Sequence, residues 1–221
     1  TRAGSPAYRT TNGGASWEKV QENLLAQTVL SYAIDPANPQ IIYAGTNSSG
    51  IYKSFNGGNT WARFSQNTPS FVSLNAVAID PKTPTTVYAG GVLGFFKSTD
   101  SGNVFALKRT GLGTGAINAI AIDPVTPATI YVGTLNGVSK STNGGETWSL
   151  TNTGLSTNPP FGPAPRVTEL AIDPTNPQVL YASTQRGGFR KSTDGGTTFS
   201  SIRLGINDIA PLFIAPLTMD P

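Results

Sequence analysis

Short runs of apolar and small residues alternate with polar residues along this chain, with the two-residue period of a β-strand. The stretch 74–108 shows the pattern most fully, with runs at 74–80, 85–91, 94–98 and 103–108. Pro81 and Pro84 separate the first two runs and exclude a central strand there, because proline cannot donate a ladder hydrogen bond. Asp80 can cap this turn by accepting backbone N–H groups. The pattern therefore predicts four short antiparallel strands, and no stretch has a helical period.

The four-strand pattern recurs at a regular distance. Segments that begin AIDP start at Ala33, Ala78, Ala121 and Ala171. A nine-residue motif such as KSTNGGETW occurs five times, and its acid or amide residue is Asn12, Asn56, Asp100, Asn143 and Asp194. The spacings of 44, 44, 43 and 51 residues make each repeat one supersecondary unit. Such units predict an all-β fold, a β-propeller of four-stranded antiparallel blades.

The repeat predicts a single β-propeller domain over residues 1–221, with about five blades' worth of sequence. The expected parts are a partial blade at 1–27, blades at about 28–72, 73–115, 116–165 and 166–208, and a partial blade at 209–221. The seam blade is then incomplete. A five-bladed ring and a piece of a larger ring both remain open, and the unpaired edges of an open arc favour five blades. The incomplete seam also leaves self-assembly open.

Composition narrows the classes of function. Charged residues make up 12% of the chain, against about 25% in a typical soluble domain. The net charge of +3 comes from scattered side chains, which argues against nucleic-acid binding. The chain has no cysteine and no histidine, so thiolate and imidazole metal ligands and histidine-based triads are excluded, and we expect no metal and no cofactor. No apolar run reaches the roughly 18 residues of a membrane span. Without an initiator Met or a signal peptide, a processed or excised piece is expected.

Within the nine-residue motif, the last eight positions, Ser/Thr-x-Asp/Asn-x-Gly-x-Thr-Trp, resemble the Asp-box, or bacterial neuraminidase repeat. All five copies match at the hydroxyl, the acid or amide and the second glycine, and Phe105 and Phe199 replace the tryptophan in two of them. The AIDPxNPxxxYAGT segment is similar to repeats of sortilin-like domains, xyloglucan-cleaving glycosidases and photosystem II assembly factors. The resemblance implies the propeller fold and turns between the third and fourth strands, away from the ligand face. It leaves the function open, because such repeats serve hydrolases, receptors and assembly factors.

We expect the repeated side chains to be structural. The acid or amide can accept turn N–H groups, and the glycines can adopt positive φ. A tryptophan that recurs once per blade indicates a core plug between blades rather than a ligand platform. The structural set is Asn12, Asn56, Asp100, Asn143, Asp194, Trp17, Trp61 and Trp148. The same interpretation covers one tyrosine per second strand and the Lys or Arg before each motif hydroxyl.

Function is expected where the repeats differ. Five carboxylates lie outside the acidic positions of the repeats: Glu18, Glu22, Glu146, Glu169 and Asp208. Glu169 stands on a first strand, where Ser31, Ala76 and Ala119 hold the matching positions. First strands of propellers line the central channel. Glu169 is therefore either a functional group that faces the channel or the partner of a nearby arginine.

Four further residues complete the candidate ligand-binding set around the last full repeat. Arg166 ends a proline-rich insert that no other repeat has, and Phe161 lies inside it. Arg186 is in the loop between the second and third strands, and Arg190 replaces an aromatic of other repeats. These loops belong to the face opposite the motif turns, and arginine suits bidentate carboxylate or phosphate contacts. The alternative is a set of unrelated surface arginines.

Three functions remain open. The first is a non-enzymatic binding or scaffold module, extracellular or periplasmic, that binds a glycan or protein partner on that loop face. The second is a glycoside hydrolase, which needs two carboxylates about 5 to 10 Å apart, with Glu169 as one and Glu22 or Asp208 as the other. A sialidase-like site lacks support, because AGS follows Arg2 where that family has its RIP signature. The third is a fragment that assembles with another chain.

Overall fold

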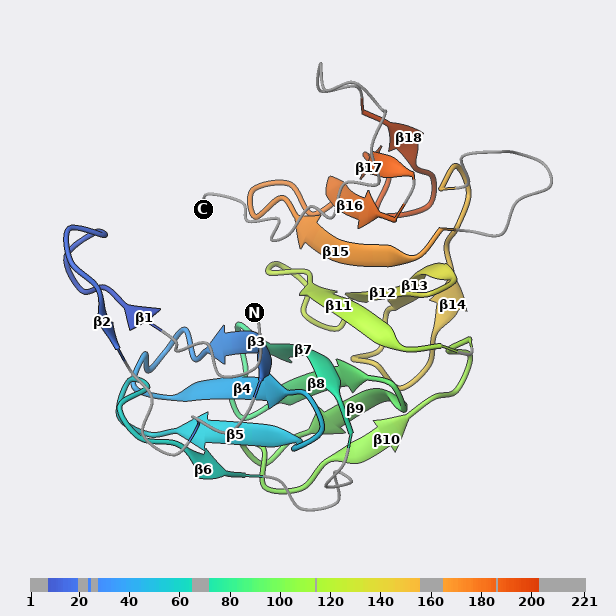
Figure 1. Ribbon diagram of the computed structural model, residues 1–221. Coiled ribbons are helices and arrows are strands. Elements are labelled where there is room, and N and C mark those ends of the chain that lie inside the picture. The colour runs from blue at the N-terminus through green and yellow to red at the C-terminus, as the bar shows by residue number, and fades with distance from the viewer. Residues whose placement is uncertain are drawn as a thin grey trace. The chain divides into compact units, whose positions relative to one another are not determined.

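A computed structural model describes residues 8–19, 24, 28–64, 72–113, 115–155, 165–185 and 187–202. These residues form strands and turns and contain no helix (Figure 1). The strands build four four-stranded antiparallel sheets and, in this part of the chain, one two-stranded sheet. The prediction of an all-β propeller of four-stranded antiparallel blades is confirmed.

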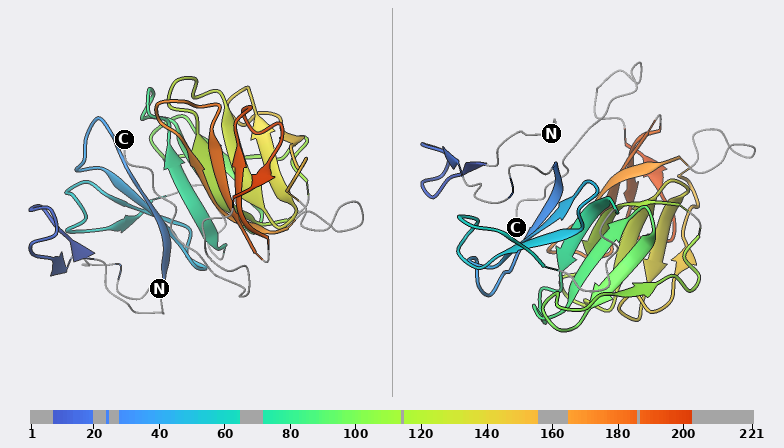
Figure 2. Two further views of the ribbon diagram at one scale, coloured as in Figure 1. Left: turned by 90° about the horizontal axis from the view of Figure 1, so that it is seen from above. Right: turned by 60° about the horizontal axis from the view of Figure 1, so that its bottom comes forward.

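Each sheet uses strands that are consecutive along the chain, as Figure 2 also shows from two other sides. The two-stranded sheet consists of β1 (Tyr8–Arg9) and β2 (Glu18–Lys19). The first full sheet consists of β3 (Val29–Ile34), β4 (Ile42–Thr46), β5 (Ile51–Ser54) and β6 (Ala62–Arg63). The second consists of β7 (Leu74–Ile79), β8 (Val87–Gly91), β9 (Gly94–Ser98) and β10 (Ala106–Lys108). The third consists of β11 (Ile117–Ile122), β12 (Ile130–Thr134), β13 (Gly137–Ser141) and β14 (Ser149–Leu150), and the fourth of β15 (Val167–Ile172), β16 (Leu180–Thr184), β17 (Gly188–Ser192) and β18 (Ser200–Ser201).

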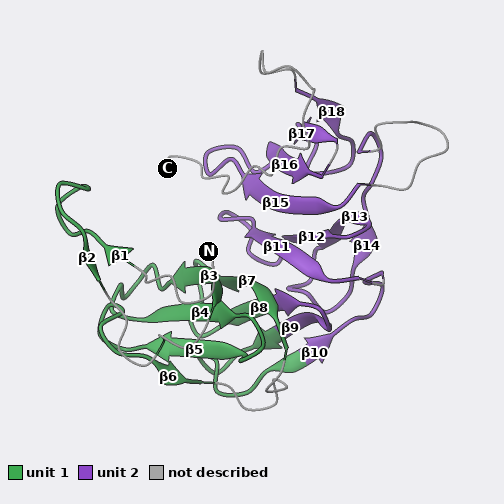
Figure 3. Ribbon diagram, viewed as in Figure 1, with its two compact units in different colours: residues 1–89, 97–106 green, residues 90–96, 107–221 purple. Residues whose placement is uncertain are grey.

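The chain divides into two compact units, residues 1–89 with 97–106 and residues 90–96 with 107–221 (Figure 3). The division runs through the sheet β7–β10, whose strands contribute to both units. In the first unit, Leu24 packs with Ala44 and Trp61 in a core cluster. In the second, a larger cluster includes Tyr131, Leu155, Val167 and Leu180.

Two kinds of turn lie at the same end of each full sheet. The Asp-Pro turn joins the first two strands, and its aspartate accepts backbone N–H groups, as at Asp80, where the nitrogens of Lys82 and Thr83 lie 2.9 Å away. The second kind, which we call the motif turns, joins the third and fourth strands at 10–17, 54–61, 98–105, 141–148 and 192–199. The two turns are bonded to each other, as by the 2.9 Å bond from Gly195 N to the Gln178 carbonyl. The loops between second and third strands therefore lie at the other end, which we call the loop end.

A bulge recurs in the first strands. The register shifts between Val29 and Ser31, between Ile117 and Ala119 and between Val167 and Glu169. A bulge places two residues opposite one and reorients the side chains that follow. Beyond the bulge, Glu169 pairs with Ser183, while Leu170 pairs with Ala182 on the opposite face.

Candidate functional site

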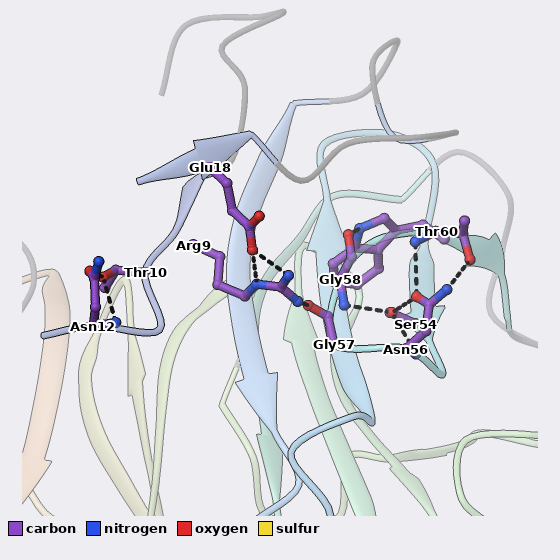
Figure 4. Close-up of polar contacts among 10 residues, drawn as sticks. Arg9, Thr10, Asn12, Glu18, Ser54, Asn56, Gly57, Gly58 and Thr60 are labelled. Carbon is purple, nitrogen blue, oxygen red and sulfur yellow. Dashed lines mark hydrogen bonds and ion pairs between the residues drawn. The ribbon is translucent and has the colours of Figure 1, made fainter. Parts of the chain in front are cut away.

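The motif turns use their polar side chains locally. Ser141 Oγ accepts the N–H of Gly145 at 2.9 Å and donates to Asn143 Oδ1 at 2.9 Å. Asn143 Oδ1 also accepts the N–H of Thr147 at 2.9 Å. Figure 4 shows the same arrangement in the turn around Asn56. The acid or amide side chain is therefore occupied by the turn that carries it.

In the last motif turn the acid is a carboxylate. Asp194 accepts from the Thr198 hydroxyl at 2.6 Å, the Thr198 N–H at 2.9 Å and the Ser192 hydroxyl at 2.7 Å. These hydrogen bonds, led by the one from the Thr198 hydroxyl, lower the pKa of Asp194 to about 2. An acceptor that is held ionised by its own turn is suited to structure rather than to proton transfer.

The repeated Tyr and Lys side chains join one repeat to the next. Tyr131 donates its hydroxyl to the Gly195 carbonyl at 2.8 Å, and Lys140 Nζ donates to the same oxygen at 2.8 Å. In the first unit, Tyr43 and Lys53 donate in the same way to Ser101, at 2.7 and 2.9 Å. In each case the acceptor is the residue after the acid or amide of the next motif turn. Burial raises the pKa of Tyr131 to about 12, with smaller contributions from Asp123 and Asp194, so its hydroxyl stays a donor.

The motif aromatics are not all buried. Trp61, Trp148, Phe105 and Phe199 are buried, and Trp148 packs edge-on against Phe95 with ring centroids 4.7 Å apart. Trp17 is 61% exposed, so the prediction that it plugs the core is wrong. Trp148 and Trp17 differ in exposure because, in the described part of the chain, only Trp148 has a preceding sheet packed against it. Trp148 is covered by a third-strand aromatic of the preceding sheet, whereas within the described residues no sheet precedes β1 and β2.

Arg166 lies at the loop end of the second unit and is exposed. Its Nη2 donates to Asn118 Oδ1 at 3.1 Å, and Asn118 Nδ2 donates to the Val167 carbonyl at 2.9 Å. The Arg166 carbonyl accepts the N–H of Gln185 at 2.8 Å. These hydrogen bonds fix one edge of the Arg166 guanidinium, and the side chain remains an exposed positive charge just before β15.

Glu169 is three residues further along, in β15. It pairs with Ser183 in the sheet and is half-buried. Burial raises the pKa of the Glu169 carboxyl above its ordinary value, and no charged group adds to or offsets this rise. A second carboxylate close by would raise the pKa further by repulsion, and a close arginine would lower it. In the described part of the chain, Glu169 is therefore electrostatically isolated.

The other candidates divide between buried and undescribed positions. Arg190 pairs with Ala182, so its side chain lies on the face of the sheet opposite Glu169, and it is only 8% exposed. The structure therefore does not bring Arg190 to Glu169. Arg186 and Phe161 lie outside the described residues, as does the insert from 156 to 164.

The remaining spare carboxylates are either paired or undescribed. Glu18 forms an ion pair with Arg9, and Glu146 forms one with Lys108, with Nζ and Oε2 2.7 Å apart. Glu22 and Asp208, the partners considered for a hydrolytic pair, lie outside the described residues. Within the described ranges, no group of three His, Cys, Asp or Glu side chains is placed to hold a metal ion.

Sequence reasoning missed Asn118. This residue orients Arg166 through its Oδ1, yet it stands at an ordinary strand position. Asn118 lies at the bulge of β11, and Asn75 holds the matching place in its own repeat, but nothing in the sequence marks either amide as the partner of an arginine. Which arginine it would contact could not be derived from spacing.

No protein-family model and no curated protein sequence matches the chain. Solved structures do. An ancestral GH74 enzyme is 24% identical over 83% of this chain, with a TM-score of 0.67. The extracellular domain of BT4673 from B. thetaiotaomicron is 16% identical over 86% of the chain and 25% of its own, with a TM-score of 0.65. YCF48 from Cyanidioschyzon merolae is 18% identical over 87% of the chain and 64% of its own, with a TM-score of 0.59.

These likenesses concern the fold. The chain spans a quarter of the ancestral GH74 enzyme and less than half of two further GH74 proteins. The neighbours include enzymes, an assembly of YCF48 with D1 peptide and an extracellular domain. In the part of the chain that is described, no helix is long and apolar enough to cross a membrane.

Proposed function

We propose that this chain is a non-enzymatic β-propeller binding or scaffold module that takes a glycan or a protein partner at the loop end, opposite the motif turns. The observation that carries the proposal is Arg166, an exposed cation at the loop end whose guanidinium is oriented by Asn118. Hydrolysis of a glycoside usually takes two carboxylates about 5 to 10 Å apart, and such a pair raises one pKa by repulsion. Among the described residues no second charged group shifts the pKa of Glu169, so recognition through the oriented Arg166 fits this end of the sheet better than hydrolysis.

Arg166 sets the chemistry of the ligand. A guanidinium with one edge held by an amide can offer its other N–H groups to a carboxylate in fixed geometry. The partner then carries an acidic group, on a uronic acid, a sialic acid or a peptide. YCF48 in complex with D1 peptide supplies a precedent for a peptide partner on this fold. An extracellular or periplasmic location accompanies the proposal and is supported by the extracellular domain of BT4673.

Isothermal titration with acidic oligosaccharides and acidic peptides tests the proposal. We expect at least one to bind the native chain and to lose about tenfold or more in affinity with Arg166→Ala, because a charge-assisted hydrogen bond is worth roughly 1.5–3 kcal/mol. Arg63→Ala, at an exposed arginine of β6, is the matched control and should leave affinity unchanged. Equal loss in both variants would contradict a site at Arg166.

The alternative is a glycoside hydrolase. It is favoured by the raised pKa of Glu169, which is a property of general acids, and by the likeness to a GH74 xyloglucanase. Release of reducing sugar from xyloglucan by the native chain, abolished by Glu169→Gln, would replace the binding proposal with this one. Absence of release, with binding retained, supports the module.

A further inference from the structure

The described chain carries the two halves of one repeated contact at its opposite ends. We call the motif turn 10–17 the head turn. We call the face of the sheet β15–β18 that bears Tyr181, Phe189 and Lys191 the tail face; these residues match the side chains that receive a motif turn at the junctions inside each unit. Both halves are present, and within the described residues neither is seen with the counterpart that it has between neighbouring sheets inside each unit.

The head turn is folded but uncovered. Gly14 N donates to Thr10 Oγ1 at 2.9 Å and Ser16 N to Asn12 Oδ1 at 2.9 Å, as in the other motif turns (Figure 4 shows Thr10 and Asn12). Gly13 and Gly14 are exposed, and no described atom lies within 4 Å of a Cβ built on either. In the equivalent places, a Cβ on Gly145 would meet the ring of Phe95 at 2.5 Å, and Gly57, Gly58, Gly195 and Gly196 are buried.

Arg9 shows that the head sheet already makes this contact on its other side. Its Nη1 donates to the Gly57 carbonyl at 2.6 Å, which is the position that Lys53 and Lys140 fill at later junctions (Figure 4). The Arg9 guanidinium is held by Glu18, with Nε 2.9 Å from Oε1. The sheet β1–β2 therefore donates a hydrogen bond to the motif turn of the next sheet through Arg9, while no described residue donates to its own Gly13 carbonyl.

The tail face is assembled but only half-covered. Lys191 Nζ lies 5.4 Å from the centroid of the Tyr181 ring, close to the 5.2 Å between Lys140 and Tyr131. Tyr181 and Phe189 are half-buried, whereas Tyr131 is 1% exposed. The donors for a motif-turn carbonyl are thus in place before any partner arrives, which lowers the ordering cost of binding.

The first and second strands of the tail face carry larger side chains than the same strands do where neighbouring sheets pack inside each unit. This difference restricts which strands of a partner can pack there. Ser31 pairs with Gly45, and Ala119 with Gly133, and the next first strand packs so close that a Cβ on Gly133 would meet Val167 at 2.7 Å. On the tail face the pair is Glu169 and Ser183. Their larger, polar side chains prevent an apolar first strand from approaching as closely. The tail face therefore fits the outer, third and fourth strands of a repeat better than its inner strands, and in the described residues the sheet β1–β2 has only these two strands.

We propose that the head turn of one copy of this chain docks on the tail face of a second copy. Tyr181 and Lys191 donate to the Gly13 carbonyl, and Trp17, exposed in one copy, packs against Phe189 of the other. Such a contact uses two different surfaces, so copies add head to tail and form closed rings or open chains. The tail face includes Glu169, but the proposed contact uses Tyr181, Phe189 and Lys191 rather than Arg166, so it does not depend on a ligand at the loop end.

Sedimentation velocity of the 221-residue chain over a range of concentrations tests the proposal. We expect the native mass to exceed one chain and to rise with concentration. Trp17→Asp, which damages the head, and Tyr181→Phe with Lys191→Met, which damages the tail, should each sediment as one chain. An equimolar mixture of the two variants should give two chains and no more, because only one intact head and one intact tail remain to pair.

The matched control is Tyr131→Phe with Lys140→Met, which removes the same donors from an internal junction and should still assemble. A native chain that stays at the mass of one chain at every concentration would overturn the proposal. A mixture that stays at one-chain mass would also overturn it, because an intact head and an intact tail would then fail to pair. Assembly that survives in both end variants would show that the copies meet through another surface.

Discussion

At the scale of the residue, a single hydroxyl organises each motif turn. Ser141 Oγ is the acceptor for Gly145 N at 2.9 Å and is also bonded to Asn143 through both its Oδ1 and its N–H. Ser141 is 1% exposed, so water cannot replace it. Loss of such an acceptor leaves a buried N–H without a partner, which costs more than the bond itself contributes.

We therefore predict that Ser141→Ala lowers the free energy of unfolding by about 1–3 kcal/mol, measured by urea denaturation. The matched control is Thr10→Ala, which removes the same bond from the exposed head turn. Water can satisfy Gly14 there, so this change should stay within about 0.5 kcal/mol of the native value. Equal costs at the two sites would contradict the role given to burial.

A second residue-scale prediction concerns Glu169. Burial raises the pKa of its carboxyl, so the folded protein holds this proton more tightly than the unfolded chain does. The associated stability is present below the unfolded pKa and is lost as the pH rises through the folded pKa. Glu169→Gln is neutral throughout, so its free energy of unfolding should exceed the native value at pH 7, and the excess should shrink below about pH 4. An excess that is independent of pH, or of opposite sign, would show that the carboxyl is not desolvated.

At the scale of the element, the contact between successive sheets decides whether a motif aromatic is structural. Trp17 and Trp148 occupy the same motif position, yet only Trp148 has a ring from the preceding sheet against it. Tyr131 and Lys140 add two hydrogen bonds to one carbonyl across another such junction. Each sheet thus depends on its neighbour for part of its stability, as in other repeat proteins.

From this we predict that Trp148→Ala destabilises the fold by about 3–5 kcal/mol, the range for a buried aromatic. Trp17→Ala should change the free energy of unfolding by less than about 0.5 kcal/mol when measured in dilute solution, where copies do not meet. Thermal denaturation followed by circular dichroism compares the two directly. A large cost at Trp17 in dilute solution would mean that a covering surface lies within the same chain.

The sequence pattern predicts where the strands lie, but it does not predict where each strand ends or where a bulge changes the direction of its side chains. Alternation predicts the strand at 74–80, and β7 spans Leu74–Ile79. The fourth strand was expected from 103, but β10 begins at Ala106, because the Asp100 carboxylate takes the N–H of Val104 at 3.0 Å and keeps it in the turn. The bulges depend on how first strands pack, which no local pattern records.

At the scale of the whole molecule, the repeats hold the fold and the differences between them mark the candidate site. Glu169 and Arg166 could be singled out because they break the repeat. Their relation to Arg190 could not, because cross-strand register and the bulge place Arg190 on the opposite face. Asn118 was missed for a different reason, since its contact with Arg166 joins strand β11 to the residue before β15, and the two strands belong to different sheets.

The structural neighbours also indicate that the repeats determine the fold but not the function. Proteins of this fold include GH74 enzymes and YCF48, at identities of 24% or less. Because enzymes and a peptide-binding protein share this fold, the scaffold does not specify the function. We therefore expect the function of this chain to depend on residues that differ between the repeats, such as Arg166 and Glu169.

Thermal denaturation with and without the acidic ligand found by titration tests the central claim most directly, in the native chain, Arg166→Ala and Asn143→Ala. We predict that Asn143→Ala lowers the Tm, because its turn loses the Oδ1 acceptor for Thr147, but keeps the ligand-induced rise in Tm. Arg166→Ala should keep the Tm of the free chain and lose that rise. The reverse result, with the ligand effect lost in Asn143→Ala and kept in Arg166→Ala, would place the site in the motif turns and contradict this account.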